Sequence, residues 1–379
     1  MFTSIAEPEH RRQLRDSAAD FLRRRCDAKA VRAAIETVDG FSRERWKAMA
    51  DLGWTALLLP EKAGGLGLGF GDVAALHHEV GKAAAPEPLA VVSLLVAQAV
   101  ARGCEGALRE PVLNRLASGD VIATLAWQAA PGALGSDRVG PHAVRSGSSW
   151  RLAGRALFAP FAARADGLVV AARVASGVAL FWLDGAPPVL EDRRLADGST
   201  QASLSFDGVH LGTDALIAGP ESGADILDGV LDTARLAASA ELLGLAERAF
   251  AMTMEHLKTR RQFGAPIGSF QALQHRAVDH YIRIELARSA LERAARVMDC
   301  GAAAAERGAE VSAAKARCGD TARDVARDCI QMHGAIGYTA ECDLSLYVNR
   351  ILVLSTWLGA ARAHRDRWAA LRLRSGEAA

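Results

Sequence analysis

The sequence predicts a mainly α-helical protein with a central β domain, on the strength of two observations. Apolar residues recur at three- and four-residue spacing in residues 9–118 and again in 223–374, which is the period of amphipathic helices. Between them, residues 121–217 hold short β-like runs separated by Gly, Pro, Asp and Ser. We therefore expect an N-terminal α-helical domain (1–120), a middle β-barrel-like domain (121–223) and a C-terminal four-helix bundle (224–379).

Composition narrows the function classes. The chain has 379 residues, half of them hydrophobic, and a formal net charge of +1. Neither sign of charge is in excess, which argues against a dedicated nucleic-acid or membrane-surface protein. The expected partners are small molecules and other subunits.

The six cysteines show no Cys-x-x-Cys pair and no metal-like spacing with histidine, so we expect no metal site and reduced thiols in a cytoplasmic protein. The first residues lack an apolar signal region. No run approaches eighteen uninterrupted apolar residues, and we expect no membrane span.

Helix signals divide the first 120 residues. Ser42 precedes a helix start, and Pro60 closes an apolar run. The glycine-rich stretch 63–71 lacks the spacing of a phosphate loop and is interpreted as a turn before a helix at 72–82. An apolar helix is expected at 89–101.

The rest of the chain divides by the same signals. Four β-like runs are expected at 121–127, 167–172, 178–183 and 202–206. Four long helices are expected at 224–259, 270–300, 302–334 and 344–373, with a short glycine-rich connection after the third.

The connection between the first two of these long helices is unusual. Residues 259–271 read Thr-Arg-Arg-Gln-Phe-Gly-Ala-Pro-Ile-Gly-Ser-Phe-Gln. A plain turn needs only the glycine and the proline. Two fixed cations beside planar amides and aromatic rings indicate a site for a flat anionic ligand such as a dinucleotide.

Three motifs in this order resemble the acyl-CoA dehydrogenase family over the whole chain. They are Arg235-Leu-Ala-Ala-Ser-Ala-Glu-Leu-Leu-Gly244, Arg260-Arg-Gln-Phe-Gly264 with Pro266-Ile-Gly-Ser-Phe-Gln271, and Gln331-Met-His-Gly-Ala-Ile-Gly-Tyr338. The resemblance implies FAD held non-covalently between subunits, oxidation of an acyl thioester to its 2,3-enoyl form, and a role in lipid catabolism.

The resemblance also assigns cofactor residues. Arg260 resembles the arginine that pairs with the FAD pyrophosphate, and Gln262 or Phe263 would flank the flavin or adenosine. Gln271 resembles a glutamine that bonds the adenosine side. Gln331 and Gly334 resemble the segment that meets FAD from a neighbouring subunit, where Gly334 permits close backbone approach. For Gly264, Gly268 and Gly337, turn formation is the preferred alternative.

The β domain departs from the family pattern. Relatives usually carry Thr-Glu-Pro-Gly-x-Gly-Ser-Asp after a strand, and this chain has Trp127-Gln-Ala-Ala-Pro-Gly-Ala-Leu-Gly-Ser136-Asp instead. The usual Trp-Ile-Thr over the flavin appears as Phe158-Ala-Pro. Trp127, Ser136 and Phe158 are expected to contact the flavin, although the motif that carries them matches the family pattern only in part.

The catalytic base is the second departure. Many relatives place a glutamate where this chain has Leu358, and others where it has Ala234. Glu241 lies two helical turns after Ala234 among apolar neighbours, a setting that raises the pKa of a carboxyl, and it resembles the base of several relatives. The alternatives are a structural Glu241 paired to an arginine, or a base at Glu341, which also suits a loop-structuring role.

Two main hypotheses follow from the resemblance. The first is an FAD-dependent acyl-CoA dehydrogenase with Glu241 as the base, an electron-transfer flavoprotein or similar acceptor, and a homodimeric or homotetrameric assembly. The second is a non-catalytic or half-site subunit of a hetero-oligomeric acyl-CoA dehydrogenase. A nitroalkane oxidase or hydroxylase is a third, weaker option.

Overall fold

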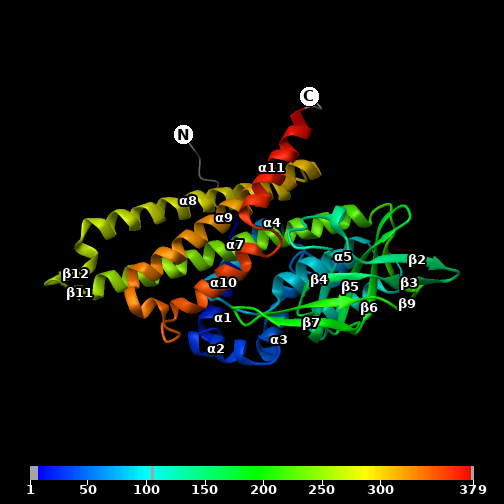
Figure 1. The fold of residues 1–379 in the computed structure, drawn as a ribbon, viewed down its shortest axis with the longest axis horizontal. Coiled ribbons are helices and arrows are strands. Elements are labelled where there is room, and N and C mark those ends of the chain that lie inside the picture. Colours follow the sequence, from blue (N-terminus) through cyan, green and yellow to red (C-terminus); the bar gives the residue numbers. More distant parts are fainter. Residues whose placement is uncertain (1–6, 104–105, 377–379) are drawn as a thin grey trace. The chain divides into compact units, whose positions relative to one another are not determined.

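The computed structural model of this chain describes residues 7–103 and 106–376. These residues form two compact units. One contains the chain up to Arg32, Gly69–Ala85 and everything from Leu236 onwards, and the other contains Ala33–Leu68 and Pro86–Arg235. The predicted fold class is confirmed, with helices in the first and last thirds of the sequence and strands that form a curled sheet in the middle third (Figure 1).

The first unit is a helical bundle in which α9 is the central contact. Helices α8, α10 and α11 all pack on α9, and α8 and α9 run side by side (Figure 1). The core is made of small and branched apolar side chains such as Leu243, Val311 and Val325, all fully buried or nearly so. Its helices are α1 (Glu9–Arg25), α4 (Phe70–Lys82), the later part of α7 (Gly223–Thr259), α8 (Gln271–Asp299), α9 (Ala304–His333), α10 (Leu344–Thr356) and α11 (Ala361–Gly376), while α2 (Ala28–Glu36) crosses the unit boundary.

The predicted final helix at 344–373 is wrong, because the structure divides it into α10 and α11. Leu358 and Gly359 have φ values of 57° and 115°, which no continuing α-helix allows. By length and composition, Leu344–Leu373 is also the one candidate membrane span among the described residues, with a mean hydropathy of 1.3 and 39% of that window buried. Both of its helices pack on α9, which accounts for their apolar residues.

Two glycines bring α4 and α7 into backbone contact. A Cβ added at Gly81 would lie 2.2 Å from the carbonyl oxygen of Glu241, and one added at Gly244 would lie 2.1 Å from the carbonyl oxygen of His78. Only glycine permits this approach. The close crossing presses the polar side chains of α4 against α7.

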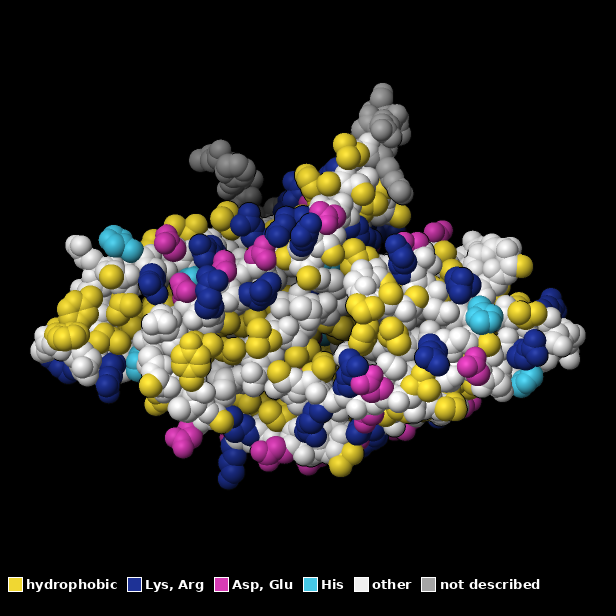
Figure 2. Space-filling view, viewed as in Figure 1, with side chains coloured by type: hydrophobic (Ala, Val, Ile, Leu, Met, Phe, Trp, Pro, Cys, Tyr) yellow, Lys and Arg dark blue, Asp and Glu magenta, His cyan; other side chains and the backbone are white. Residues whose placement is uncertain are grey.

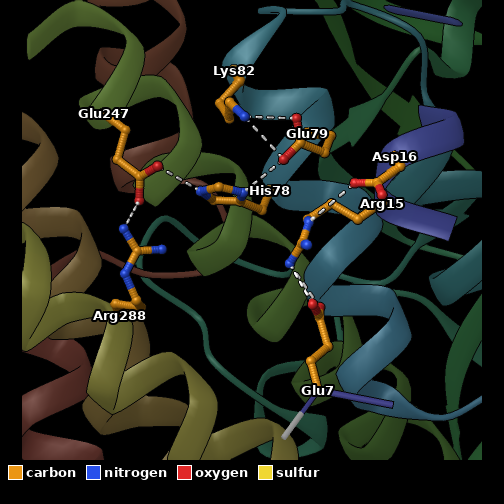
Figure 3. A network of polar contacts seen from close by, with 8 residues as sticks. All are labelled: Glu7, Arg15, Asp16, His78, Glu79, Lys82, Glu247 and Arg288. Carbon is orange, nitrogen blue, oxygen red and sulfur yellow. Dashed lines mark hydrogen bonds and ion pairs between the residues drawn. The ribbon is translucent and has the colours of Figure 1, made fainter. Parts of the chain in front are cut away.

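A polar network with His78 at its centre joins three helices of this unit (Figure 3). His78 Nε2 lies 2.9 Å from Glu247 Oε2, and His78 Nδ1 lies 3.3 Å from Glu79 Oε1. Arg288 on α8 donates to the other oxygen of Glu247 at 2.8 Å, and Lys82 donates to Glu79. An imidazole with a carboxylate at each nitrogen is best satisfied as an imidazolium that donates twice.

This network predicts a pH-dependent stability. Burial by itself lowers the pKa of His78, but the hydrogen bonds to Glu247 and Glu79 outweigh it and raise the pKa above its ordinary value. A raised folded-state pKa gives stability that is complete below the unfolded pKa of about 6.5 and is lost as the pH rises through the folded value. Replacing His78 by Gln should cost about 1.5–3 kcal/mol at pH 6 and less at pH 9, measured by urea unfolding. An equal cost at both pH values would contradict the charged state.

The second unit begins with short helices. Ser42 caps α3 (Arg43–Asp51) as predicted, because its side chain accepts a hydrogen bond from the backbone N–H of Arg45. The apolar helix predicted at 89–101 is present, but its first part is the π-helical segment η3 (Ala90–Val96), followed by α5 (Ala97–Gly103) and α6 (Arg109–Ala117). Shorter 3₁₀ turns are η1 (Trp54–Ala56) and η2 (Glu61–Ala63).

The β part of this unit has a seven-stranded and a three-stranded sheet. The larger runs in the order β10-β6-β5-β2-β3-β9, with β1 parallel to β5, and the smaller runs β4-β8-β7. The predicted runs became β1, β5, β6 and β8. Buried residues are nearly continuous in the first three strands and alternate with half-buried ones in β8. The strands are β1 (Ala123–Ala126), β2 (His142–Ser146), β3 (Ser149–Ala153), β4 (Arg155–Pro160), β5 (Gly167–Val174), β6 (Gly177–Asp184), β7 (Val189–Arg194), β8 (Thr200–Ser205), β9 (Val209–Gly212) and β10 (Leu216–Ala218).

Candidate cofactor and catalytic site

The motif between α7 and α8 folds as a tight hairpin. Strands β11 (Arg261–Gln262) and β12 (Ala265–Pro266) pair, and the two residues between them, Phe263 and Gly264, both have positive φ values of 53° and 80°. This is the geometry of a two-residue type I′ turn, which normally favours Asn or Gly at the first position. The hairpin therefore holds a phenylalanine in a conformation that costs backbone energy.

Phe263 is also 93% exposed, so it gains little burial within the described residues to compensate for that cost. Figure 2 shows hydrophobic side chains gathered over this end of the bundle, with Lys and Arg side chains beside them. Phe270 meets Phe263 edge to face at 6.2 Å. Strained and exposed aromatic residues indicate a surface that another molecule covers.

Arg260 and Gln271 lie at the two ends of the same connection, and both side chains are exposed. No carboxylate among the described residues lies within ion-pair distance of Arg260, whose backbone oxygen instead accepts a hydrogen bond from Ile267 at 2.8 Å. Gln262 is exposed as well, on β11. The guanidinium and the amides are therefore free to bind an anionic, hydrogen-bonding ligand, and the chemistry of the donor set fits FAD.

The end of α9 supplies the second predicted cofactor segment. Gln331 is exposed in the last turn, and Gly334 follows with φ 71° and ψ −147°, a conformation that glycine alone adopts readily. A Cβ at Gly334 would meet no heavy atom within 4 Å. The backbone thus requires glycine here, and the open space beside it leaves the close approach of a ligand possible.

The β-domain segment is held by its own unit. Asp228, near the start of α7, accepts hydrogen bonds from both the backbone N–H and the hydroxyl of Ser136, each at 2.8 Å. Arg235 is fully buried, pairs with Asp232 at 2.7 Å and donates to the carbonyl oxygen of Leu134. The donors of Ser136 that were predicted for FAD are therefore satisfied within the protein, and only hydroxyl lone pairs remain.

The other two predicted flavin contacts in this unit differ in exposure. Trp127 is buried directly after β1. Phe158 is half-buried, with φ 57°, where the pairing of β4 with β8 shifts register between Ala156 and Ala159. A bulge with a left-handed residue re-aims a side chain, so Phe158 is the better placed of the two to meet a ligand.

Glu241, the predicted base, is buried in a polar cluster. One carboxylate oxygen lies 2.8 Å from Nδ1 of His77 on α4, and the other accepts a hydrogen bond from Arg350 on α10 at 3.1 Å. The side chains of Glu241 and His77 are less than 5% exposed. The cluster ties three helices of the bundle together.

The expected rise in the pKa of Glu241 is wrong. Burial by itself raises that pKa, but the hydrogen bond from His77 and the charge of Arg350 outweigh it and leave the pKa below its ordinary value. A carboxylate with a lowered pKa and both oxygens engaged is a poor proton acceptor. Glu241 is thus paired to an arginine, as the alternative interpretation expected, and its role as the base stays a prediction.

Leu358 lies in the loop between α10 and α11, whose backbone carbonyls are held by two buried side chains. Lys315 on α9 is 1% exposed, and its Nζ donates to the carbonyl oxygens of Leu354, Ser355 and Gly359 at 3.0, 3.4 and 3.2 Å. The imidazole of His364, fully buried, donates through Nε2 to the carbonyl oxygen of Leu358 at 3.0 Å. The ammonium satisfies the orphan carbonyls at the end of α10.

The remaining carboxylate candidate is Glu341, which is exposed in the turn before α10. Ala234 is fully buried on α7. Among the described residues no group of three or more His, Cys, Asp or Glu could hold a metal ion. The described residues therefore offer no free buried carboxylate at any of the expected base positions.

The partners that determine the role of Glu241 were not predicted from the sequence. His77 and Arg350 lie 164 and 109 residues from Glu241, so no local spacing predicts their contact. Asp228 was more accessible to prediction, because it lies two helical turns before Arg235 and therefore on nearly the same face. The seven-residue spacing could have predicted that Asp228 and Arg235 contact the same loop, the one that holds Leu134 and Ser136.

Comparison with known proteins agrees with the fold and motifs. Residues 8–120 match the model described as acyl-CoA dehydrogenase, N-terminal domain, and residues 221–371 match acyl-CoA dehydrogenase, C-terminal domain. The acyl-CoA dehydrogenase IpdE2 of Mycobacterium tuberculosis is 33% identical over 351 residues, covering 91% of this chain and 92% of the relative. The chain belongs to the acyl-CoA dehydrogenase family.

Two solved structures are similar throughout. A Tcur3481–Tcur3483 steroid ACAD variant has a TM-score of 0.87 and 30% identity, covering 98% of this chain and 99% of that one. The ChsE4–ChsE5 complex from Mycobacterium tuberculosis has a TM-score of 0.86 and 25% identity, with 96% and 97% coverage. This protein is accordingly an oxidoreductase, a flavoprotein of lipid catabolism whose cofactor is FAD.

Proposed function

We propose that this chain is one subunit of a hetero-oligomeric acyl-CoA dehydrogenase that converts an acyl-CoA thioester into the 2,3-enoyl-CoA. In this proposal the chain contributes part of the FAD site, and a partner subunit of the same family contributes the catalytic carboxylate. Electrons then pass to an electron-transfer flavoprotein or a similar acceptor. The single observation that carries the proposal is the double pairing of Glu241 with His77 and Arg350.

The chemistry explains why this pairing matters. Dehydrogenation removes the α hydrogen as a proton and the β hydrogen as a hydride, so that a double bond forms between the two carbons. Bound FAD supplies the hydride acceptor. The proton needs an accessible and sufficiently basic carboxylate. Glu241 has a lowered pKa and a hydrogen bond at each oxygen, and Ala234 and Leu358 carry no carboxylate.

The cofactor part of the proposal rests on exposed groups of the bundle. Arg260 would pair with the FAD diphosphate, and Gln271 would bond the adenosine side. Gln262 and Phe263 would flank the ring systems. Gln331 and Gly334 would meet FAD held by the neighbouring subunit. Of the degenerate β-domain residues, Phe158 and Trp127 would contribute apolar surface and Ser136 an acceptor oxygen.

Two relatives support a hetero-oligomer and suggest a substrate class. The structures described as Tcur3481–Tcur3483 and ChsE4–ChsE5 are each named for two proteins, and the first is called a steroid ACAD. We therefore propose a bulky, steroid-type acyl thioester as the substrate of the assembly that includes this chain. A panel of acyl-CoA esters with an artificial electron acceptor tests this choice against linear chains.

The second candidate is a homodimer or homotetramer in which Glu241 is itself the base. It is favoured by the nearly complete burial of that carboxylate on the face of α7 that also carries Ala234. A base paired to His77 would then have to release its partners before accepting a proton.

Purification and one substitution separate the two candidates. The chain should purify colourless alone, and should become yellow when co-expressed with a family member that carries a glutamate at the position of Ala234 or Leu358. Replacing Glu241 by Gln in that complex should leave its turnover within about threefold, whereas loss of the general base should lower turnover by about 10²–10⁴. Glu247→Gln is the matched control on the same helix. A yellow, active homo-oligomer that Glu241→Gln inactivates would establish the second candidate instead.

A further inference from the structure

Two histidines stack beside the candidate cofactor residues. His256 lies in the last turn of α7, one helical turn before Arg260, and His333 is the last residue of α9, two residues after Gln331. Their ring centroids are 4.5 Å apart with an interplanar angle of 21°. Both side chains are half-buried, so each ring has one side in the protein and one towards solvent.

The two rings have few polar partners among the described residues. Nδ1 of His333 donates to the carbonyl oxygen of Cys329 at 2.9 Å, which leaves Nε2 for another partner. No hydrogen bond or ion pair reaches the ring of His256 from the described residues. Two protonated rings at this distance would repel each other, and the guanidinium of Arg260 adds a further positive charge.

The nearby carboxylates are already paired. On α7, Glu255 forms an ion pair with Lys258 at 2.8 Å. On α9, Asp328 forms an ion pair with His280 at 2.9 Å. The corner therefore holds three groups that are cationic or can become so, without an anion of its own among the described side chains.

We propose that His256 and His333 belong to the diphosphate-binding site and that the pair takes up a proton when the FAD diphosphate binds beside Arg260. This inference rests on the proposed FAD site. It adds two binding residues to that site and makes cofactor affinity depend on pH. The diphosphate supplies the negative charge that the corner lacks, and a protonated imidazole can donate to a phosphate oxygen.

The direction in which FAD affinity changes with pH follows from the pKa of His256 in the FAD-free protein. Burial, then the charges of His333 and Arg260, lower the pKa of His256 below its ordinary value. An anion at the same corner favours the charged imidazole and raises that pKa. Because the bound form holds more protons than the free form, the affinity for FAD rises as the pH falls from about 8 to 6.

The test uses the complex with the partner subunit, because the proposed function gives this chain only part of the FAD site, and it measures FAD affinity and proton uptake together, without turnover. We expect the dissociation constant for FAD, from flavin fluorescence, to fall about five- to tenfold between pH 8 and pH 6 at constant ionic strength. Calorimetry in buffers of different ionisation enthalpy should show proton uptake on binding. Hydrogen–deuterium exchange at the imidazole carbon should show that FAD, or inorganic pyrophosphate alone, raises the pKa of His256.

Variants distinguish this inference from the site on which it rests. His256→Phe keeps a stacking ring without a proton, so its FAD affinity should vary little with pH, while His210→Gln on exposed β9 should behave as wild type. Unchanged pH dependence in His256→Phe, with no proton uptake in the wild type, overturns the histidine inference alone. In the complex with the partner subunit, FAD affinity that is undetectable or unaffected by Arg260→Ala overturns the proposed FAD site, and the histidine inference with it.

Discussion

Replacing Leu358 by glutamate should raise the acyl-CoA dehydrogenase activity of the FAD-loaded complex by about 10²–10⁴ when the partner subunit's own base has been replaced by glutamine. The family resemblance places the base of many relatives at this position, and the loop that carries it is rigidly held. Lys315 and His364 fix the backbone on both sides, and Leu358 already adopts φ 57°, so the exchange adds no new backbone strain. The measurement is turnover of an acyl-CoA panel with an artificial electron acceptor.

Leu352→Glu is the matched control, because it places the same carboxylate on α10 at a side chain that is 51% exposed. It should show no gain. If Leu358→Glu folds, binds FAD and still shows no gain, the loop does not present its side chain to the substrate. The base of the assembly must then act elsewhere than at the position equivalent to Leu358.

Replacing Lys315 by Met should lower the free energy of unfolding by about 3–5 kcal/mol. Methionine has a similar length and no donors, so three carbonyl oxygens at the end of α10 and in the loop lose their shared ammonium in a buried setting. Urea unfolding at fixed protein concentration measures the change, because association would otherwise shift the apparent stability.

Lys258→Met is the control for the lost charge. Lys258 is exposed, and its one ion pair with a described residue is with Glu255 on its own helix, so its removal should change stability by about 0.5 kcal/mol or less. A Lys315 variant as stable as the Lys258 variant would show that the ammonium is not needed by the loop. In the double variant with Leu358→Glu, loss of Lys315 should also remove most of the gained activity.

The helices were predictable where one face is apolar over many residues. Helices α7, α8 and α9 end within two residues of their predicted bounds, because their periodicity is long and continuous. The break at Leu358 was not predictable in this way, since the residues on both sides continue the helical pattern. The carbonyls there find a donor on another helix, and that donor, Lys315, is more than 40 residues away along the chain from Gly359.

The strands show the same limit. The runs at β5 and β6 were predicted because both faces are buried and the residues are apolar without interruption. Strand β7 was missed because all six of its residues are exposed, so its sequence, Val-Leu-Glu-Asp-Arg-Arg, carries no alternation of polarity. Pairing to β8, rather than burial, makes it a strand.

For the candidate site, residue types were informative and residue roles were not. Arg260 and Gln271 are exposed, as an anion-binding role requires, and that role stays a prediction. Glu241 was chosen because its neighbours in sequence are apolar, yet its neighbours in space are His77 and Arg350. The pKa of a buried carboxyl depends on such distant partners, which only the fold reveals.

The path of α7 has a consequence for how this protein can be made and divided. One compact unit draws on three separate stretches of chain and the other on two, and α7 runs unbroken from Gly223 to Thr259 across the boundary at Arg235. No single cut of the polypeptide yields one complete unit. On a ribosome, the first unit cannot close until nearly the whole chain has emerged, so its N-terminal helices wait for partners made more than 200 residues later.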